Sequence, residues 1–283
     1  MGIIELLKAV LFGIVEGVTE WLPVSSTGHI ILLEHFLPLR DDFYELFEIV
    51  IQLAAILAVS VLFFHKLNPF SPKKDTVQKK DTLTLWYKVV IAVAPSAVLG
   101  LLIDGPLDDF LKATHVLGTT LNVIVVSLAL IGYGIAFLFV EKKAGSNFRI
   151  QEVSQIDYRT ALLIGAFQCL SIIPGTSRSG ATILGALLLG VSRSAGAEFS
   201  FFLAIPTMLG ASALKLLDFF LDGVTATAAE WGILLASCVV SFVVSVLVIR
   251  GLMEYVRKRS FAPFGIYRIV LGVLVLGLFA IFG

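Results

Sequence analysis

Long apolar stretches recur along the whole chain and predict its architecture. Six of them are long enough to cross, as α-helices, a hydrocarbon core about 30 Å thick. Apolar runs of this length are typical of membrane spans rather than of the shorter helices of a soluble core. The pattern therefore predicts an all-α membrane protein. The six predicted transmembrane helices are 42–65, 83–104, 115–141, 194–220, 228–256 and 262–282.

Two further apolar stretches are interrupted near their middle. The first, 2–37, is broken around 21–26, and the second, 157–190, is broken around 173–177. Each half is short for a span, which favours a re-entrant helix pair over a membrane crossing. A proline in each break removes a backbone donor, and the hydroxyl residues that follow it suit the N-cap of a second helix.

The two interrupted stretches resemble each other. Residues 13–28 and 165–180 both run from a glycine through an acid or amide to a proline, a group of hydroxyl residues and a second glycine. The segments that follow, 48–54 and 198–204, also match. The period of this repeat is about 150 residues, or half the chain, as in membrane proteins built from two similar halves.

The repeat indicates a single membrane domain, 1–283, with halves at about 1–145 and about 150–283. Each half contains one predicted re-entrant helix pair and three predicted spans. Because three is an odd number, the second half must insert upside down relative to the first. We therefore expect an inverted-topology repeat whose broken helices meet near the middle of the bilayer.

The distribution of lysine and arginine predicts the orientation. One set of loops is rich in these residues, and the opposite set holds few of them among many acids. The basic side is cytoplasmic by the positive-inside rule, so both termini and the opening of the first re-entrant pair face outward. The basic loops hold Lys66, Lys73, Lys74, Lys79, Lys80, Lys142, Lys143, Arg149, Arg257, Lys258 and Arg259. The opposite loops hold Arg40, Lys112, Lys215, Asp41, Asp42, Asp104, Asp108, Asp109, Asp218 and Asp222.

Composition agrees with a membrane protein. The chain is 58% hydrophobic and only 15% charged, whereas soluble domains are about 25% charged. Its mean hydropathy is +0.96. The formal net charge is zero, so charge points to no nucleic-acid partner. The bilayer itself is the expected surrounding.

Two acidic residues stand among apolar neighbours in the first interrupted stretch. Glu16 and Glu20 are four positions apart, so on a helix they share one face. Two carboxylates in a low-dielectric setting repel each other, which favours a shared proton or a shared cation. The pair is therefore a candidate metal and substrate site. The alternative is an interfacial pair that points at water.

A cluster of hydroxyl groups with one histidine follows the first break. If a helix begins near Ser25, its free N–H groups form an anion site. Ser26 and His29 are three positions apart, close enough for a hydroxyl and an imidazole to act on one substrate. Ser25 and Thr27 complete this candidate binding group. A lone histidine on an apolar helix is more often a core residue, but this one stands beside two glutamates and three hydroxyls.

Arg178 lies deep within the second interrupted stretch. Its guanidinium offers a fixed fork of donors that suits phosphate oxygens, and a buried arginine without an anion is very costly. A structural ion pair with Glu16 or Glu20 is the alternative role, and the two roles are compatible. The neighbouring hydroxyl residues, all candidate substrate ligands, are Thr176, Ser177, Ser179 and Thr182.

Three more polar residues lie within predicted spans, namely Gln52, Glu48 and Glu198. We place Gln52 among the candidate substrate ligands, although hydrogen bonds between helices account for all three nearly as well. Spacing alone thus predicts an anion-handling site of acid, hydroxyl, imidazole and guanidinium groups. It does not identify the anion.

Two long motifs resemble those of the undecaprenyl-diphosphate phosphatase family of the bacitracin-resistance type. They are Glu16-Gly-Val-Thr-Glu20-Trp-Leu-Pro-Val-Ser-Ser-Thr-Gly-His29 and Pro174-Gly-Thr-Ser-Arg178-Ser-Gly-Ala-Thr182. The similarity continues through 198–206 and 261–268, so it covers nearly the whole chain. Two motifs of this length at this separation are highly specific.

The resemblance implies hydrolysis of undecaprenyl diphosphate to undecaprenyl phosphate and inorganic phosphate, which recycles the lipid carrier of bacterial cell-wall synthesis. It also implies six spans plus two re-entrant helix pairs, and a location in the bacterial inner membrane with the active site open to the periplasm. A divalent cation, Mg²⁺ or Ca²⁺, is the implied cofactor. The expected partner is a polyprenyl diphosphate lipid, and a homodimer is a candidate assembly.

Glu20, Ser26, His29 and Arg178 are the predicted catalytic residues. Arg178 and the two helix N-termini hold the diphosphate by positioning and charge neutralisation. Ser26 is the candidate nucleophile, with His29 as its base or as proton donor to the leaving group. Glu20, with Glu16, binds the metal or acts as acid and base. Direct attack by water or by His29 stays open.

A transporter is the rival class of function. Inverted repeats with broken helices also build transporters, and a polyprenyl-phosphate flippase needs the same kind of anion site.

Overall fold

The computed structural model describes residues 3–37, 41–113, 118–145, 148–221 and 227–282. The regular structure in these ranges is helical, and their one strand-type pairing is an isolated bridge between Ile150 and Val191. The prediction of an all-α protein is confirmed for this part of the chain.

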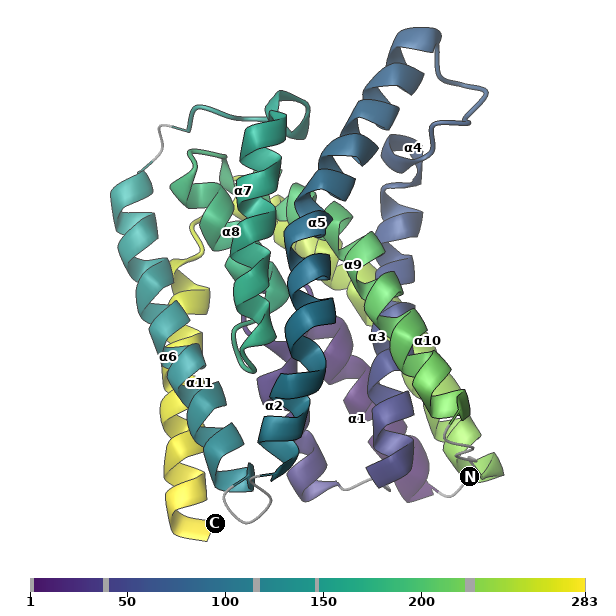
Figure 1. Cartoon of the computed structure of the whole chain (residues 1–283), viewed down its shortest axis with the longest axis vertical. Coiled ribbons are helices and arrows are strands. Elements are labelled where there is room, and N and C mark those ends of the chain that lie inside the picture. The colour runs from purple at the N-terminus through teal and green to yellow at the C-terminus, as the bar shows by residue number, and fades with distance from the viewer. Residues whose placement is uncertain (1–2, 38–40, 114–117, 146–147, 222–226, 283) are drawn as a thin grey trace.

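Among the described residues, five helices meet the length and apolarity that a membrane span needs, and they run along the molecule (Figure 1). Each contains an apolar segment long enough to cross a membrane. The predicted spans from 83–104 onward all fall on them, which confirms a multi-pass membrane protein. The helices are α5 (Thr76–Ala113), α6 (Gly118–Ala144), α9 (Arg193–Leu221), α10 (Ala228–Val256) and α11 (Ala262–Phe282).

The remaining predicted span, 42–65, falls on helix α3 (Asp41–Leu62). The described apolar part of this helix, Leu46–Leu62, is shorter than the other five apolar segments. The structure by itself therefore supports five candidate spans.

Both helix breaks fall where the sequence predicts them. Helix α1 (Ile3–Thr19) is followed by α2 (Ser26–Phe36). Helix α7 (Tyr158–Gln168) continues as the short 3₁₀ helix η2 (Cys169–Ile172), and α8 (Arg178–Leu188) follows. In Figure 1, α1 and α2 lie in the lower half of the molecule and α7 and α8 in the upper half.

The connection between the first two predicted spans is more ordered than hydropathy suggests. It contains the short helix α4 (Phe64–Leu67), and α5 begins at Thr76 rather than near residue 83. Gln78 N donates to Asp75 Oδ1 at 2.8 Å, and Asp75 N donates to Gln78 Oε1 at 3.2 Å. This reciprocal pair stabilises a polar helix start, which an apolar-span criterion does not detect.

Polar contacts also order the turn before α7. The 3₁₀ helix η1 (Val153–Gln155) precedes it, and Asp157 Oδ1 accepts a hydrogen bond of 2.7 Å from Thr160 N. Asp157 is the N-cap of α7, and its hydrogen bonds with Thr160 lower the pKa of its carboxyl.

Helix α1, which carries Glu16 and ends one residue before Glu20, packs along α10. Serines on α10 bind the backbone of α1. Ser237 Oγ donates to Ala9 O at 3.0 Å, and Ser245 Oγ donates to Gly17 O at 3.5 Å. Small residues of this kind let two helices approach closely within a membrane. The backbone of α1 is therefore held by a long neighbouring helix.

A buried ion pair ties together α6, α9 and the start of α11. Arg193 Nε lies 3.0 Å from both carboxylate oxygens of Glu141, and Arg193 Nη2 lies 2.5 Å from Glu141 Oε2. Phe261 N donates to Glu141 Oε1 at 2.8 Å. Bidentate pairs of this kind are strong and directional, so they fix the relative positions of these helix ends.

Gly165 is the point where α7 touches α5, and it gives a stability prediction. A Cβ at Gly165 would lie 1.9 Å from the Ala92 carbonyl oxygen, a backbone atom with no freedom to move aside. We expect Gly165→Ala to destabilise the protein by about 1–3 kcal/mol, through overpacking. Thermal unfolding in detergent measures this effect. Gly251→Ala is the matched control, because nothing lies within 4 Å of its added Cβ; equal melting temperatures for the two variants would contradict the prediction.

Candidate active site

Both breaks end in the same backbone conformation. Ser25 caps α2 and accepts a hydrogen bond of 3.4 Å from Gly28 N, and Ser177 caps α8 and accepts one of 3.1 Å from Gly180 N. Their φ angles, 74° and 68°, are the only positive ones among the described non-glycine residues. Such strain costs on the order of 1–3 kcal/mol and clusters at functional sites. These two predicted substrate ligands therefore use their hydroxyl groups to shape the turns.

Glu20 joins the first residues of the two capped helices. Ser26 opens α2, and its Oγ donates to Glu20 Oε2 at 2.8 Å. Arg178 opens α8, and its Nη2 donates to Glu20 Oε1 at 3.0 Å. Glu20 is 7% exposed, so these charge-assisted bonds lie in a site with little water. Three of the four predicted catalytic residues are thus in direct contact, although they come from opposite halves of the sequence.

His29 points to a different partner. Its Nδ1 lies 2.7 Å from the Ser25 carbonyl oxygen, and its Nε2 lies 2.6 Å from the hydroxyl of Tyr267. A carbonyl only accepts, so in the neutral ring Nδ1 carries the hydrogen and Nε2 accepts from Tyr267. The two rings are parallel, with centroids 5.6 Å apart.

The acceptor of the Ser26 hydroxyl hydrogen is therefore Glu20 and not His29. The sequence predicts two alternative roles for His29, as base for Ser26 or as proton donor to the leaving group. The first role would need a bond between Ser26 and His29, whereas Ser26 donates to Glu20. The resting geometry leaves His29 on the other side of the Ser25 turn, with one nitrogen held by backbone and one by Tyr267.

Arg178 also contacts the second half of the chain. Its Nη1 donates to the Ser200 carbonyl at 3.1 Å, while its buried Nε has no hydrogen-bond acceptor among the described residues. The ion pair with Glu20, weighed in the sequence analysis as an alternative, is present. An anion that enters the site could accept hydrogen bonds from the Arg178 guanidinium without displacing the Arg178 side chain.

Two other predicted substrate ligands hold the breaks together. Ser179 Oγ donates to Glu20 O at 3.2 Å, which links α8 to the end of α1. Thr182 Oγ1 lies 2.7 Å from Ser200 Oγ and donates to Arg178 O at 3.0 Å. Both residues are buried. Their hydroxyl groups are thus engaged in positioning Glu20 and Arg178.

Glu16 lies one helical turn before Glu20 and is 1% exposed. Its Oε1 has no hydrogen-bond partner among the described residues, and the charges of Glu20, Glu48 and Arg178 act on it. A buried carboxylate oxygen without a partner favours uptake of a proton or a cation.

The last three predicted ligands are placed less directly. Thr176 is buried in the second break, where its carbonyl accepts a hydrogen bond. Gln52 is half-buried on α3. No hydrogen bond within the described residues joins it to Glu20, Ser26 or Arg178. The side chain of Thr27 lies outside the described part of the structure.

Known proteins resemble this chain over nearly its whole length. Residues 9–274 match the family described as bacitracin resistance protein BacA. The chain belongs to the BacA family. It is 52% identical to an undecaprenyl-diphosphatase of Limosilactobacillus fermentum, over 98% of this chain and 99% of that protein. It is 53% identical to undecaprenyl-diphosphatase 1 of Clostridioides difficile, over 98% of this chain and 97% of that protein.

Two site residues of this BacA-family chain were not predicted from the sequence. Tyr267 and Arg268 are adjacent on α11, and both reach the breaks. A signal for Arg268 was available, because it is the only charged residue within the predicted span 262–282. A charge inside a membrane span marks a functional site by default. No comparable signal exists for a tyrosine.

Arg268 binds both breaks at once. Its side chain is fully buried. Nη1 donates to Pro23 O at 3.2 Å, and Nη2 donates to Gly175 O at 2.9 Å and Thr176 O at 3.0 Å. Its guanidinium carbon lies 5.3 Å from the centre of the Tyr133 ring. Carbonyl dipoles and an aromatic face thus take the place of a carboxylate, and one side chain fixes the distance between the two turns.

The residues fit a metal ion that is shared with the substrate. Glu16 and Glu20 offer carboxylate oxygens, the ligands that Mg²⁺ and Ca²⁺ prefer. Both oxygens of Glu20 already bind protein groups, so Glu16 Oε1 is the better ligand. Among the described residues no three His, Cys, Asp or Glu side chains gather into a metal site. Phosphate oxygens would have to complete the coordination, as is usual for Mg²⁺.

Tyr267 gives a test of the histidine geometry. Tyr267→Phe removes the donor to His29 Nε2 but keeps the stacked ring. A single hydrogen bond contributes about 0.5–1.5 kcal/mol, so we expect turnover to fall by about two- to tenfold. Steady-state phosphate release measures it. His29→Ala should lose far more activity; equal losses in the two variants, or none in Tyr267→Phe, would contradict this arrangement.

Proposed function

We propose that this protein hydrolyses undecaprenyl diphosphate to undecaprenyl phosphate and inorganic phosphate. One observation carries the proposal: Glu20 binds the Ser26 hydroxyl and the Arg178 guanidinium at the same time, at the N-termini of two helices. A nucleophile, a base and an anion clamp are the parts that phosphoryl transfer needs. Full-length relatives at about 50% identity bear the name undecaprenyl-diphosphatase, which supports a lipid diphosphate phosphatase.

The proposed reaction has two steps. In the first, Ser26 Oγ attacks the terminal phosphorus and its proton passes to Glu20. The bond between that phosphorus and the bridging oxygen breaks, and undecaprenyl phosphate leaves. In the second, a water oxygen attacks the phosphorus of the phosphoserine and gives up a proton to a neighbouring base. The bond between phosphorus and Ser26 Oγ breaks, and Ser26 Oγ recovers a proton from Glu20. The sum is one water consumed and one inorganic phosphate released.

Each remaining group has a positioning or electrostatic task in this proposal. Arg178 and the N-terminal N–H groups of α2 and α8 neutralise the phosphate oxygens. The bonds to the Ser25 carbonyl and to Tyr267 hold the His29 ring in place. Glu16 would hold the divalent cation against the diphosphate; when bound, that ion supplies charge neutralisation of the phosphate oxygens.

The deciding experiment is phosphate release by the purified chain in detergent. The substrate is undecaprenyl diphosphate, with and without Mg²⁺ or Ca²⁺. Detergent removes the two separate compartments, so a flippase has nothing to transport and releases no phosphate. Release that is absent under all metal conditions would overturn the enzyme assignment.

We further propose the finer topology. The chain crosses the inner membrane six times, α1–α2 enters from the outer side, and α7–α8 enters from the cytoplasmic side. The positions of these pairs in opposite halves of the molecule (Figure 1) and the positive-inside rule support this arrangement.

Labelling from outside tests the topology. Single cysteines are introduced on a background without the native ones. We expect a membrane-impermeant maleimide to label Ile3→Cys and Thr227→Cys in intact cells. Lys74→Cys and Tyr158→Cys should react only after the membrane is opened. Labelling of Lys74→Cys and Thr227→Cys from the same side would show that the topology is wrong.

A further inference from the structure

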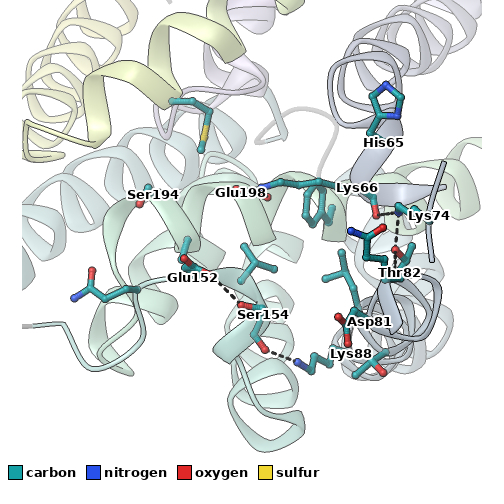
Figure 2. Close-up of a pocket in the computed structure, with 18 of the residues that line it drawn as sticks. His65, Lys66, Lys74, Asp81, Thr82, Lys88, Glu152, Ser154, Ser194 and Glu198 are labelled. Carbon is teal, nitrogen blue, oxygen red and sulfur yellow. Dashed lines mark hydrogen bonds and ion pairs between the residues drawn. The ribbon is translucent and has the colours of Figure 1, made fainter. Parts of the chain in front are cut away.

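Two adjoining cavities open at the end of the molecule where α4 lies. The first has a volume of about 810 Å³ and lies between the start of α5 and the start of α9 (Figure 2). The second has a volume of about 670 Å³ and lies between the ends of α3 and α10. We call the two together the basic-face pocket. Both are lined by His65, Lys66, Glu198, Met253 and Arg257.

The pocket carries an excess of positive charge. Six lysines and arginines line it against four acids. Three of the lysines are engaged: Lys66 with Glu198 at 2.5 Å, Lys74 with Thr82, and Lys88 with the Ser154 carbonyl. The other three, Arg250, Arg257 and Lys258, have no side-chain partner within the described residues and are exposed.

The second cavity adds an apolar wall. Leu62 and Phe63 from the end of α3 and Ile249 and Met253 from α10 form it. These residues lie near the ends of two membrane-type helices and are buried or half-buried, so the wall is an apolar recess between α3 and α10. The free guanidinium groups of Arg250 and Arg257 lie just beyond it. An apolar wall and a cationic rim therefore meet near the ends of two membrane-type helices, where headgroups of a bilayer are expected.

We propose that the basic-face pocket binds an anionic phospholipid of the leaflet on that side. Its phosphate lies between Arg250 and Arg257, and the first part of its acyl chains lies against the wall of α3 and α10. Arginine forks match phosphate oxygens, and basic pockets between membrane helices bind lipid phosphates on the cytoplasmic side. A free phosphate ion has no apolar part to contact this wall, so the wall favours a lipid over inorganic phosphate. The site is separate from Glu20, Ser26 and Arg178.

Native mass spectrometry of the full chain, released from detergent, measures this binding. The probes are phosphatidylglycerol and phosphatidylcholine at equal concentration. We expect the wild type to retain phosphatidylglycerol preferentially. Arg250→Gln with Arg257→Gln should lower its affinity on the order of 30-fold, since each basic residue near a membrane surface contributes about fivefold. Both side chains are exposed, so folding should be unaffected.

The matched control removes two other free cations at the same end of the molecule. Lys142→Gln with Lys143→Gln lies at the end of α6, outside the pocket, and should keep the lipid preference. Equal retention of the two lipids by the wild type overturns the proposal. So does an equal loss in the control pair, which would indicate general surface charge. Displacement by glycerol 3-phosphate at comparable concentration would assign the pocket to small phosphates. Binding of polyprenyl phosphate but not of phosphatidylglycerol would assign it to the lipid of the reaction.

Discussion

Arg178→Ala is expected to lower turnover about a hundredfold while the protein still inserts into the membrane. Loss of one charge-assisted phosphate contact in a dry site costs on the order of 3 kcal/mol. The structure adds a second cause. Without Arg178, the buried carboxylate of Glu20 loses its cation and one of the two bonds that hold it beside Ser26. Phosphate release by purified protein measures the loss.

Two further variants make the result specific. Arg178→Lys keeps the charge but not the fork that reaches Glu20 and the Ser200 carbonyl together, so it should lose most of the activity as well. Arg149→Ala removes an exposed arginine outside the site and should leave turnover unchanged. Near-normal turnover of Arg178→Ala, in protein that elutes as a single species, would remove Arg178 from the site.

Much of the fold could be predicted because hydrophobicity acts on whole helices. The apolar stretches that became α5, α6, α9, α10 and α11 are long, and a span of that length has few alternatives in a bilayer. The breaks were predictable for a related reason. Proline interrupts a helix and hydroxyl residues cap the next one, and both effects depend mainly on neighbouring residues. The polar start of α5 was missed because the Asp75–Gln78 pair stabilises a helix without burying apolar surface.

The sequence predicted which residues form much of the site, but not which hydrogen bonds join them. Spacing along one helix suggested that Ser26 and His29 work together, yet Ser26 bonds Glu20 across the break. The positive φ of Ser25 turns α2 so that His29 faces Tyr267, on a helix 238 residues further along the chain. Such contacts depend on how helices from the two halves pack, and the order of residues within one segment does not specify that packing.

The equivalent positions of the two halves carry different chemistry. Ser26 and Arg178 both follow a capping serine with positive φ, and both open an eleven-residue helix. One half thus supplies a hydroxyl where the other supplies a guanidinium, and Glu20 binds the two. An exactly symmetric repeat would have placed two like groups there. Divergence at this position thus places a hydroxyl and a guanidinium, two different groups, on one carboxylate.

Ser26→Ala is expected to reduce turnover on the order of a thousandfold and to leave lipid-diphosphate binding largely intact. Alanine removes the attacking oxygen, but Arg178 and the N-termini of α2 and α8 still hold the anion. The prediction is a fall in kcat at nearly unchanged affinity. Ser60→Ala is the matched control, because its hydroxyl bonds only the Ile56 carbonyl of its own helix. It should behave as the wild type.

Glu20→Gln separates the base from the nucleophile. Glutamine keeps the shape, but its amide has one acceptor oxygen, so it can keep only one of the two bonds from Ser26 and Arg178. It also takes no proton, so kcat should fall while substrate binding is retained or tightens as a negative charge disappears near the anion. Acid-quenched turnover of substrate labelled in its terminal phosphate distinguishes the two variants. Protein-bound phosphate should form slowly in Glu20→Gln and not at all in Ser26→Ala. Substantial turnover by Ser26→Ala would instead favour water or His29 as the attacking group, and a normal rate in Glu20→Gln would leave the 2.8 Å contact with Ser26 without a catalytic role.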